Sequence, residues 1–373
     1  MKKILILMGR YLPGHKDGGP LRTIVNLTEA LGDEYQFYIA CLDRDNGDTK
    51  PYPDIQRNKW NKVGKAKVWY VAPKGFTDRV LLGLAKGKDL IYLCSFFDDY
   101  GYKTLLLKKR NKINCPVAIA SMGVFSEGAL AQKGLKKKVF ISGCKSLGLF
   151  NNITWSVTSE IEADDIKRVI GKNIKYIVAE DLPRTNVPGF VQKGETFSVA
   201  FLSRISPKKN LLTAIKILQH VYSTMNFYIY GPTEDIDYWN KCKKELEKLP
   251  ENVTWYYKGD VPSENVQEEL AKHDVFLFPT LGENYGHVIF EALSVGCIPV
   301  ISDRTPWIII KDQNAGYVLS LDNLKDFSDA IDKICNMNKN ARNEMQNRGI
   351  QIALNKVEEN RKETGYRIIF GRD

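Results

Sequence analysis

The chain has 373 residues and 43% of them are hydrophobic, which predicts about two domains with a core each and excludes a disordered or low-complexity protein. No apolar stretch approaches the roughly 20 residues of a membrane-spanning helix. The seven cysteines are scattered and none forms a C-x-x-C pair. The pattern therefore favours neither a zinc site nor a disulfide framework, and it fits a reducing cytoplasm.

The apolar run Ile4–Met8 is too short for a secretory leader and continues into Gly9 and Arg10 instead of a small-residue cleavage site. It predicts a buried first strand. Further apolar runs alternate with helical patterns, which is typical of βα units and parallel sheets. Strands are expected at 3–8, 36–41, 67–72, 90–94, 116–120, 153–158, 175–179, 197–202, 226–230, 253–258, 274–278, 298–301 and 316–319. Helices are expected at 21–31, 210–223, 238–248, 264–272, 287–295 and, as one stretch, 339–369.

This alternation predicts an α/β protein of two Rossmann-like, doubly wound domains that face an interdomain cleft. The turn-rich segment 181–189 is the expected linker. The N-terminal domain is expected at 1–185 and the second domain at 190–354. The last helix, about 355–373, is expected to join the first domain.

Charge is distributed unevenly in this chain, whose net charge is +10. Residues 1–190 carry about +12 and residues 191–373 about −2. A basic first half favours a partner with phosphates or an anionic membrane surface. We expect no nucleic acid partner.

The densest basic segment carries Lys133, Lys136, Lys137 and Lys138 and continues into the apolar run 139–141. A basic amphipathic segment of this kind can lie on anionic lipid. An ordinary surface helix with a solvated basic face explains the pattern equally well, so both interpretations stay open.

Three segments carry residues suited to binding an anionic sugar derivative. Gly18 and Gly19 follow the first strand, where a residue without Cβ lets backbone approach a ligand. Arg204 and Lys209 follow strand 197–202, and two cations at a strand end can neutralise a diphosphate. The third segment is the string from Gly282 to Leu293, which places Glu283 and Glu291 eight residues apart across a loop-to-helix junction.

Within this string, Asn284 and Tyr285 precede Gly286, His287 and Val288. The amides of the last three are expected at a helix N-terminus, where N–H groups and the helix dipole favour an oxygen-rich or anionic ligand.

The string resembles the E-x7-E signature of retaining glycosyltransferases of family 4, in the form found in bacterial polysaccharide-assembly enzymes, and the resemblance covers nearly the whole chain. It implies the GT-B fold. It also implies that Glu283 and the backbone after it hold the donor sugar, and that Glu291 accepts hydrogen bonds from the ribose hydroxyls. The segment around Arg204 and Lys209 is similar to the family's R-L-x-x-x-K-G segment, with Asn210 in place of a glycine.

On the first domain, the Gly18–Gly19 loop looks like the family's Gly-Gly loop near the donor phosphates. The segment 121–130 resembles a family segment that faces the cleft, which assigns Ser121 and Gly123 to the acceptor side. Met122 occupies a position that commonly holds His or Arg, so that polar contact is missing. Glu160, after Ser159, loosely matches a recurrent acidic position of the family.

The resemblance predicts a hexosyltransferase that uses a nucleotide sugar, a UDP-sugar above all, and a saccharide or lipid-linked saccharide acceptor. It implies retention of configuration, no metal and no cofactor, with Arg204, Lys209 and Glu283 as the catalytic residues. The predicted location is the cytoplasm, peripheral at the inner face of the plasma membrane, in the synthesis of capsule, exopolysaccharide or O-antigen.

Three other functions stay open on the residues alone. A metal-dependent enzyme could use the D-x-D pairs Asp43/Asp45 or Asp235/Asp237. A glycoside hydrolase could use Glu283 and Glu291 as its acid and nucleophile, provided the two flank one bond at about 5–9 Å. A non-catalytic module could bind the sugar nucleotide without transferring it.

Overall fold

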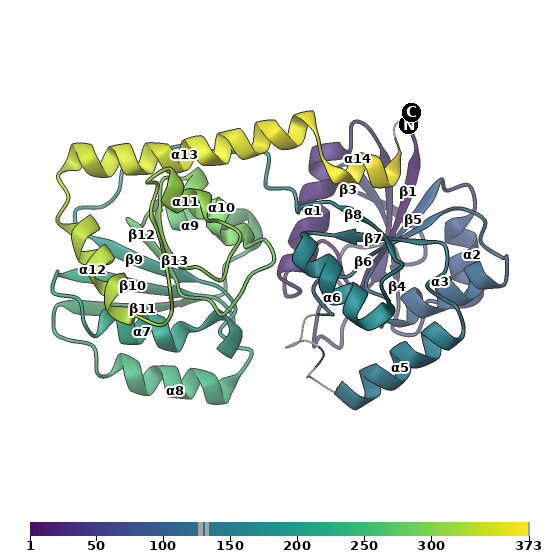
Figure 1. Cartoon of the computed structure of the whole chain (residues 1–373), viewed down its shortest axis with the longest axis horizontal. Helices are drawn as coiled ribbons and strands as arrows, with labels where there is room; N and C mark the ends of the chain where they lie inside the picture. Colours follow the sequence, from purple (N-terminus) through teal and green to yellow (C-terminus); the bar gives the residue numbers. More distant parts are fainter. Residues whose placement is uncertain (126–129, 131–133, 372–373) are drawn as a thin grey trace. The chain divides into compact units, whose positions relative to one another are not determined.

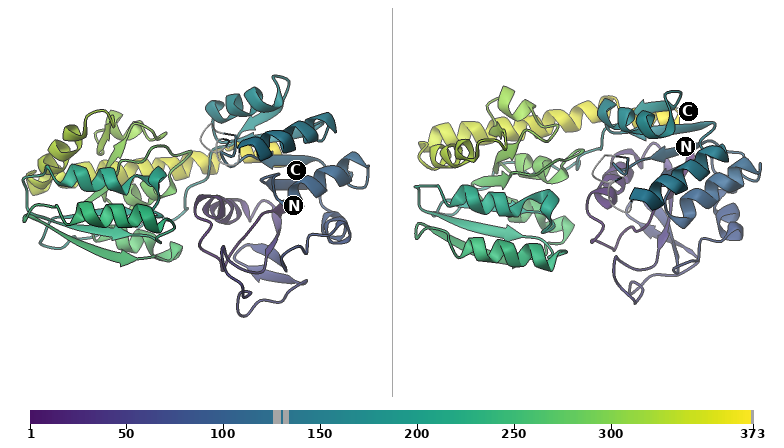
Figure 2. Two further views of the ribbon diagram at one scale, coloured as in Figure 1. Left: turned by 90° about the horizontal axis from the view of Figure 1, so that it is seen from below. Right: turned by 60° about the horizontal axis from the view of Figure 1, so that its bottom comes forward.

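The computed structural model describes residues 1–125, 130 and 134–371. It divides into two compact units, Met1–Leu182 with Glu359–Asp373 and Pro183–Glu358 (Figure 1). Each unit is a sheet with helices packed on it (Figure 2). The two units are described separately.

Unit 1 contains an eight-stranded sheet of order β3-β4-β2-β1-β5-β6-β7-β8. All neighbouring strands run parallel except β3 and β4, which form an antiparallel edge. The strands are β1 Lys3–Leu7, β2 Gln36–Leu42, β3 Trp60–Val63, β4 Ala66–Val71, β5 Leu90–Cys94, β6 Val117–Ala120, β7 Ile153–Val157 and β8 Lys175–Val178. The helices are α1 Gly19–Leu31, α2 Asp78–Ala85, α3 Asp99–Lys109, α5 Gly134–Ser146, α6 Glu160–Ile170 and α14 Gly365–Phe370.

Strand β1 explains why this sheet is covered on both faces. Its side chains alternate, so Ile4 and Ile6 belong to a core shared with α1 and α14, while Leu5 and Leu7 belong to the core under α2, α3, α5 and α6. A strand buried on both faces is a continuous apolar run, as this one is.

Helix α14 belongs to unit 1 although it lies at the far end of the chain. Phe370 makes edge contacts with the rings of Tyr35 and Phe37, with ring centroids 5.3 and 5.9 Å apart. Arg367 donates from Nε and Nη2 to the two carboxylate oxygens of Glu34 at 2.7 and 2.6 Å. The aromatic contacts and this two-bond ion pair together fix the helix on the sheet.

Unit 2 contains a six-stranded parallel sheet of order β11-β10-β9-β12-β13-β14. Its strands are β9 Ser198–Leu202, β10 Met225–Tyr230, β11 Val253–Gly259, β12 Val275–Phe278, β13 Ile298–Ser302 and β14 Tyr317–Leu319. Its helices are α7 Leu211–Leu218, α8 Ile236–Leu246, α9 Val266–Ala271, α10 His287–Ser294, α11 Ile309–Asp312, α12 Leu324–Cys335 and most of α13 Lys339–Lys362, with short 3-10 turns at Pro207–Lys209 and Ser263–Asn265. The end of α13, from Glu359, belongs to unit 1.

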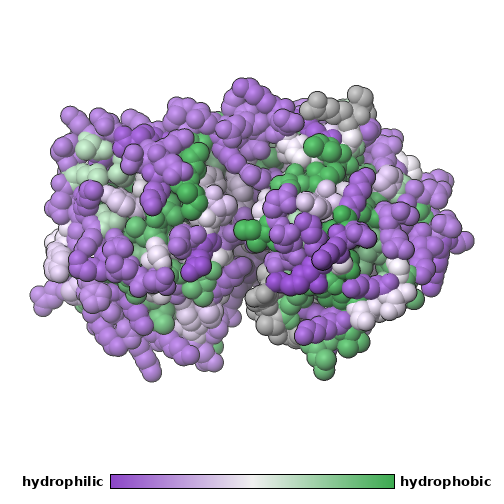
Figure 3. Space-filling model, viewed as in Figure 1, coloured by the Kyte–Doolittle hydropathy of each residue, from purple (hydrophilic) through white to green (hydrophobic). Residues whose placement is uncertain are grey.

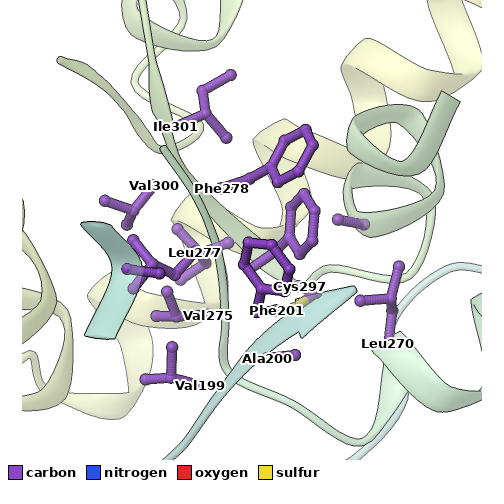
Figure 4. Close-up of a cluster of buried hydrophobic side chains, with 14 of the residues drawn as sticks. Val199, Ala200, Phe201, Leu270, Val275, Leu277, Phe278, Cys297, Val300 and Ile301 are labelled. Carbon is purple, nitrogen blue, oxygen red and sulfur yellow. The ribbon is translucent and has the colours of Figure 1, made fainter. Parts of the chain in front are cut away.

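The strand order of unit 2 reverses between β9 and β12. In open α/β sheets the loops at the carboxyl ends diverge at such a reversal and leave a crevice that binds ligands. The core beneath includes side chains from these two strands, among them Phe201 and Phe278, whose ring centroids are 5.9 Å apart (Figure 4). The fold therefore places the loops after β9 and β12 side by side on a rigid apolar base.

The prediction of parallel α/β architecture is confirmed, and all thirteen expected strands are present within one residue at each end. Strand β3 was missed. Helix α7 ends at Leu218 rather than 223. The expected single helix over 339–369 is wrong, because the chain breaks after Lys362 and starts α14 with Thr364 as its cap. Gly365, the first residue of α14, lies so close to β8 that a Cβ there would be 2.0 Å from the carbonyl oxygen of Val178.

Among the helices in the described ranges 1–125 and 134–371, none combines the length and hydrophobicity needed to cross a bilayer.

Replacing Phe370 by Ala should lower the free energy of unfolding of unit 1 by about 3–5 kcal/mol, because a buried aromatic anchor of α14 is lost and a cavity remains. The denaturant midpoint, followed by fluorescence, measures this change. Ile368 lies on the same helix but is 64% exposed, so Ile368→Ala is the matched control and should change stability by about 0.5 kcal/mol or less. Equal effects of the two substitutions would show that α14 is not anchored through its aromatic face.

Candidate functional site

The predicted residues Lys209 and Glu283 meet at the reversal of the sheet in unit 2. Lys209 ends the 3-10 turn after β9, and Glu283 lies in the loop after β12. The ammonium Nζ donates to the carboxylate Oε1 at 2.6 Å, and the two side chains are only 16% and 11% exposed. Thr280 donates from its hydroxyl to the same carboxylate oxygen at 3.0 Å. The sequence separation of 74 residues is closed by the pairing of β9 with β12.

Burial lowers the pKa of Lys209, and the neighbouring cations Arg204 and Lys208 lower it further, while the Glu283 carboxylate opposes the shift. The ammonium also lies 5.6 Å from the centroid of the Phe278 ring. The ring face attracts the ammonium and helps to hold it in place. At a largely desolvated position, a cation interacts more strongly with an anion than a surface lysine does.

Asn210 shows why a glycine of the family pattern can be replaced here. Its backbone is left-handed, with φ 64° and ψ 39°, a conformation that Asn tolerates better than most residues. Its side-chain amide donates to the carbonyl of Pro279 at 2.8 Å, and its amide oxygen accepts from Thr213. Asn210 therefore starts α7 and also ties the loop after β9 to the loop after β12.

Arg204 lies in the same loop as Lys209 but faces solvent more. Its guanidinium donates to Glu234 at 3.1 Å, and the two side chains are 41% and 39% exposed. An exposed ion pair of this kind contributes about 0–1 kcal/mol, so a phosphate could replace Glu234 at small cost.

The string after β12 forms the N-terminal end of α10 as predicted. Gly286 caps the helix with φ 83° and ψ 59°, and a Cβ there would meet the Ile289 side chain at 2.9 Å. Tyr285 is buried against Trp307, whose indole N–H donates to the Tyr285 carbonyl at 2.5 Å. Asn284 is exposed, and His287 and Val288 are half-buried in the first turn.

Glu291 lies on the same helix, one turn after His287, and is 4% exposed. Its carboxylate Oε1 accepts a hydrogen bond from Nε of Arg184 at 2.9 Å. Arg184 also donates from Nη2 to the Ser263 carbonyl. Glu291 is thus held by a different cation from the one that holds Glu283.

In unit 1, the predicted loop residues also lie at carboxyl ends of strands. Gly18 has φ 62° and precedes α1, which starts at Gly19, and a Cβ at Gly19 would meet nothing within 4 Å. The loop between β1 and α1 is fixed by Arg10, which bonds Asp17 at 3.2 Å, and by Asp45, which accepts from the His15 amide at 2.8 Å.

Ser121 and Gly123, the predicted acceptor-side residues, converge on one buried carboxylate. Glu162 Oε1 accepts from the Ser121 hydroxyl and from the Gly123 amide at 2.8 Å, and its Oε2 accepts from the Thr158 amide at 2.7 Å. Between them Met122 has φ 51°. The remainder of this predicted segment, 126–129, lies outside the described residues.

The buried carboxylate of this region is therefore Glu162, whereas Glu160 is exposed and accepts from the Tyr176 hydroxyl. Ser159 caps α6 and accepts from the Glu162 amide at 3.3 Å. This S-x-x-E capping pattern is the sequence signal that could have identified Glu162. Arg184 and Thr280 were also missed, and nothing local in the sequence marks them.

The D-x-D pairs have other partners. Asp43 pairs with Arg44 at 2.8 Å and with Arg57 at 2.7 Å, and Asp235 caps α8 by accepting from the Tyr238 amide. In the described part of the chain, no group of three or more His, Cys, Asp or Glu side chains is arranged to hold a metal ion.

Helix α5 carries the described part of the basic segment, while Lys133 lies outside the described residues. Leu135 and Val139 are 79% and 66% exposed, and the exposed Lys136 and Lys138 lie between them in the sequence. Hydrophobic and hydrophilic atoms accordingly lie side by side over α5 (Figure 3). An exposed surface of this composition suits the interface of an anionic bilayer.

A cavity of about 900 Å³ lies elsewhere in unit 1, at the amino ends of β6, β7 and β8. Its lining includes Lys145, Lys172 and Lys175 but none of the predicted site residues. Because ligands of open parallel sheets bind at the carboxyl ends of the strands, this cavity is not the candidate site.

Residues 186–352, nearly all of unit 2, match the family model described as glycosyl transferases group 1, and the E-x7-E segment that suggested this resemblance lies within the match. Anabaena Alr3699/HepE, solved in complex with UDP and glucose, aligns over 97% of this chain and 98% of its own, with a TM-score of 0.72 and 14% identity. The predicted GT-B fold is confirmed by this likeness.

Two curated relatives are similar over shorter stretches. The sulfoquinovosyl transferase SQD2 of Arabidopsis thaliana is 32% identical over 94 residues, which cover 25% of this chain and 18% of the relative. The UDP-Gal:alpha-D-GlcNAc-diphosphoundecaprenol alpha-1,3-galactosyltransferase of Escherichia coli is 27% identical over 170 residues, 42% of each protein. The aligned stretches thus span less than half the length of either relative.

The histidines other than His287 include one with a clear structural role. His273 is 3% exposed, and its ring nitrogens contact the Tyr230 hydroxyl at 2.8 Å and the Ser198 hydroxyl at 3.2 Å. Burial, together with the nearby Lys193 and Lys272, lowers the pKa of His273 from 6.5 to about 3. The ring is therefore neutral in the folded protein at neutral and mildly acidic pH.

Between about pH 3 and 6.5 the unfolded chain binds a proton at His273 that the folded chain does not. The free energy of unfolding should therefore rise with pH across this window, by at most about 1.4 kcal/mol per pH unit. His273→Gln should remove that part of the slope, whereas His220→Gln, at an exposed position, should keep it. Denaturant titrations at several pH values measure both, and an unchanged slope in His273→Gln contradicts the assignment.

Proposed function

We propose that the chain transfers a hexosyl unit from a UDP-sugar to a hydroxyl of a saccharide or lipid-linked saccharide acceptor, with retention of configuration and without a metal. The observation that carries this proposal is the Lys209–Glu283 pair, which lies at the sheet reversal inside the segment that matches the family model.

The residues of this site in unit 2 have two roles, because some bind the diphosphate of the donor and others bind its sugar. Lys209 and Arg204 are the cations that meet the diphosphate, and the N-terminal end of α10 adds backbone N–H groups and the positive end of its dipole. Glu283, Asn284 and the backbone that follows hold the donor sugar. Positive charge placed where the leaving group develops negative charge stabilises the transition state more than the ground state.

In the proposed reaction, the bond between the sugar's anomeric carbon and the diphosphate oxygen breaks while the acceptor oxygen bonds to the same carbon. The acceptor proton passes to the departing phosphate, so the products are a glycoside and a nucleoside diphosphate. Attack from the face that the leaving group vacates retains the configuration. No protein nucleophile is needed, and Glu283 serves to position the sugar.

The relatives support the choice of donor and acceptor. HepE was crystallised with UDP and glucose, and the name of the Escherichia coli relative specifies a UDP-sugar donor and a diphosphoundecaprenol-linked acceptor. A lipid-linked acceptor fits the basic and apolar surface of α5. We therefore propose that the protein works in the cytoplasm at the inner face of the plasma membrane, in the synthesis of a cell-surface polysaccharide.

Glu283→Ala and Lys209→Ala should each reduce transfer by about a hundredfold or more, because each removes a charge that contacts the donor. The donor is first identified as the nucleotide sugar that raises the melting temperature of the wild-type protein, and transfer is then measured with it in the presence of EDTA. Lys208→Ala is the matched control, because this neighbouring lysine is exposed, and it should keep most of the activity. Loss of activity in EDTA would instead favour a metal-dependent enzyme. Binding of the donor without transfer to any acceptor would favour a non-catalytic module.

Removing charge from α5 should weaken binding to anionic vesicles. Lys136→Glu with Lys138→Glu should lower the partition of the protein into phosphatidylglycerol vesicles by about tenfold or more, since each basic residue near such a surface contributes about 1 kcal/mol. Co-sedimentation at low salt measures the effect. The control, Lys325→Glu with Lys333→Glu on α12 of unit 2, makes the same change in net charge and should have a smaller effect.

A further inference from the structure

Arg184 is the second residue of unit 2 and has no regular secondary structure. Its guanidinium makes two directed contacts, from Nε to the Glu291 carboxylate at 2.9 Å and from Nη2 to the Ser263 carbonyl. The Arg184 and Glu291 side chains are 17% and 5% exposed. This is a largely desolvated ion pair between a segment before the sheet and a helix 107 residues later.

The segment 184–193, here called the strap, is fixed along α9 and α10. The Gln267 amide donates to the Asn186 carbonyl at 3.0 Å and to the Ser294 hydroxyl at 2.8 Å. The Gly189 amide donates to the Ser294 carbonyl at 3.0 Å. The backbone that carries Arg184 is thus anchored to the same helix as Glu291, so the guanidinium meets the carboxylate from a fixed position.

We infer that Arg184 is a positioning residue for the ribose of the donor nucleotide, acting through Glu291. The inference rests on the proposed function and on the role that the family resemblance implies for Glu291, which is to accept hydrogen bonds from the ribose hydroxyls. Arg184 does not itself touch the donor in this proposal. It fixes the orientation of the carboxylate that does.

The geometry explains why an arginine suits this role. A guanidinium is a planar fork with several donors, so one side chain can bond a carboxylate and a carbonyl at the same time. With Oε1 of Glu291 bonded to Nε and the fork bonded to Ser263, the position of the carboxylate is restrained before a ligand arrives. A preset acceptor loses less conformational freedom when it binds the ribose.

A purely structural role for the pair predicts a different outcome. In that case the loss of Arg184 would lower stability and weaken the binding of every ligand by a similar factor. A positioning role predicts that affinity falls mainly for ligands that carry ribose hydroxyls. The ratio of two dissociation constants, for UDP and for 2′,3′-dideoxy-UDP, separates these outcomes.

Isothermal titration of the full chain gives this ratio for wild type, Arg184→Ala, Arg184→Lys and Glu291→Gln. Wild type should bind UDP about tenfold or more tightly than the dideoxy analogue, because hydrogen bonds to a charged acceptor are strong. Arg184→Ala and Glu291→Gln should each reduce the preference to about twofold. The double variant should lose no more of the preference for UDP than either single variant, since both substitutions remove the same contact. Arg184→Lys should recover part of the preference, because it restores the charge but not the fork.

Arg342→Ala is the matched control. Arg342 also pairs with a buried carboxylate in unit 2, Asp274 at 3.6 Å, and donates to the carbonyls of Cys335 and Met337, but not to α10. It should keep the wild-type preference. An unchanged preference in both Arg184→Ala and Arg184→Lys, or an equal loss in Arg342→Ala, would overturn the inference while leaving the proposed function intact. If wild type binds no UDP, the proposed function fails and the inference fails with it.

Discussion

One ion pair, between Lys209 and Glu283, depends on the whole topology of unit 2. Its two members come from loops that follow β9 and β12. These strands are neighbours in the sheet although five helices and strands, α7, β10, α8, β11 and α9, separate them in the chain. A largely desolvated pair gains Coulomb energy but loses hydration, so its net contribution to stability is small or even unfavourable. A hydrophobic pair of the same volume would stabilise the fold at least as well. The pair is therefore better explained by what its charges can do for a ligand.

The parts of the fold that could be predicted from the sequence are those that depend on local hydrophobic patterns. Buried parallel strands such as Ile298–Ser302 are continuous apolar runs, and this pattern alone located every strand that lies inside the sheets. Strand β3 was missed because it lies at an edge, where Trp60 and Val63 are only half-buried and the apolar pattern is weak. The break before α14 was missed as well. At this break Gly365 lies too close to Val178 to carry a Cβ, a constraint that exists only in the tertiary structure.

The residues of the candidate site likewise differ in whether the sequence alone could identify them. Lys209 and Glu283 could be identified from motifs, because each motif is a short string with a fixed place after a strand. Arg184 could not, because its partner Glu291 lies 107 residues away and a single arginine in a turn-rich segment carries no pattern. Glu162 is intermediate, since its capping relation to Ser159 is local while its contact with Ser121 is not. Long-range contacts between polar side chains are set by topology, which hydrophobic periodicity describes only in outline.

Backbone conformation supports the assignment independently of charge. Residues with positive φ occur at the carboxyl ends of the strands that carry the candidate site, including Asn210 at 64° and Gly286 at 83° in unit 2 and Met122 at 51° in unit 1. Gly231, after β10, has φ 130°, and a Cβ there would lie 1.9 Å from the Ser203 carbonyl oxygen, so the loop that carries Arg204 can pass directly beside it. Each non-glycine residue of this kind costs about 1–3 kcal/mol and persists only where surrounding contacts enforce it. Asn210 is enforced by its bond to Pro279, the same contact that joins the Lys209 loop to the Glu283 loop. The strained backbone and the ion pair thus lie at the same contact between the two loops. The bond from Asn210 to Pro279 stabilises the unfavourable backbone and also holds the loops together where the proposed chemistry requires it.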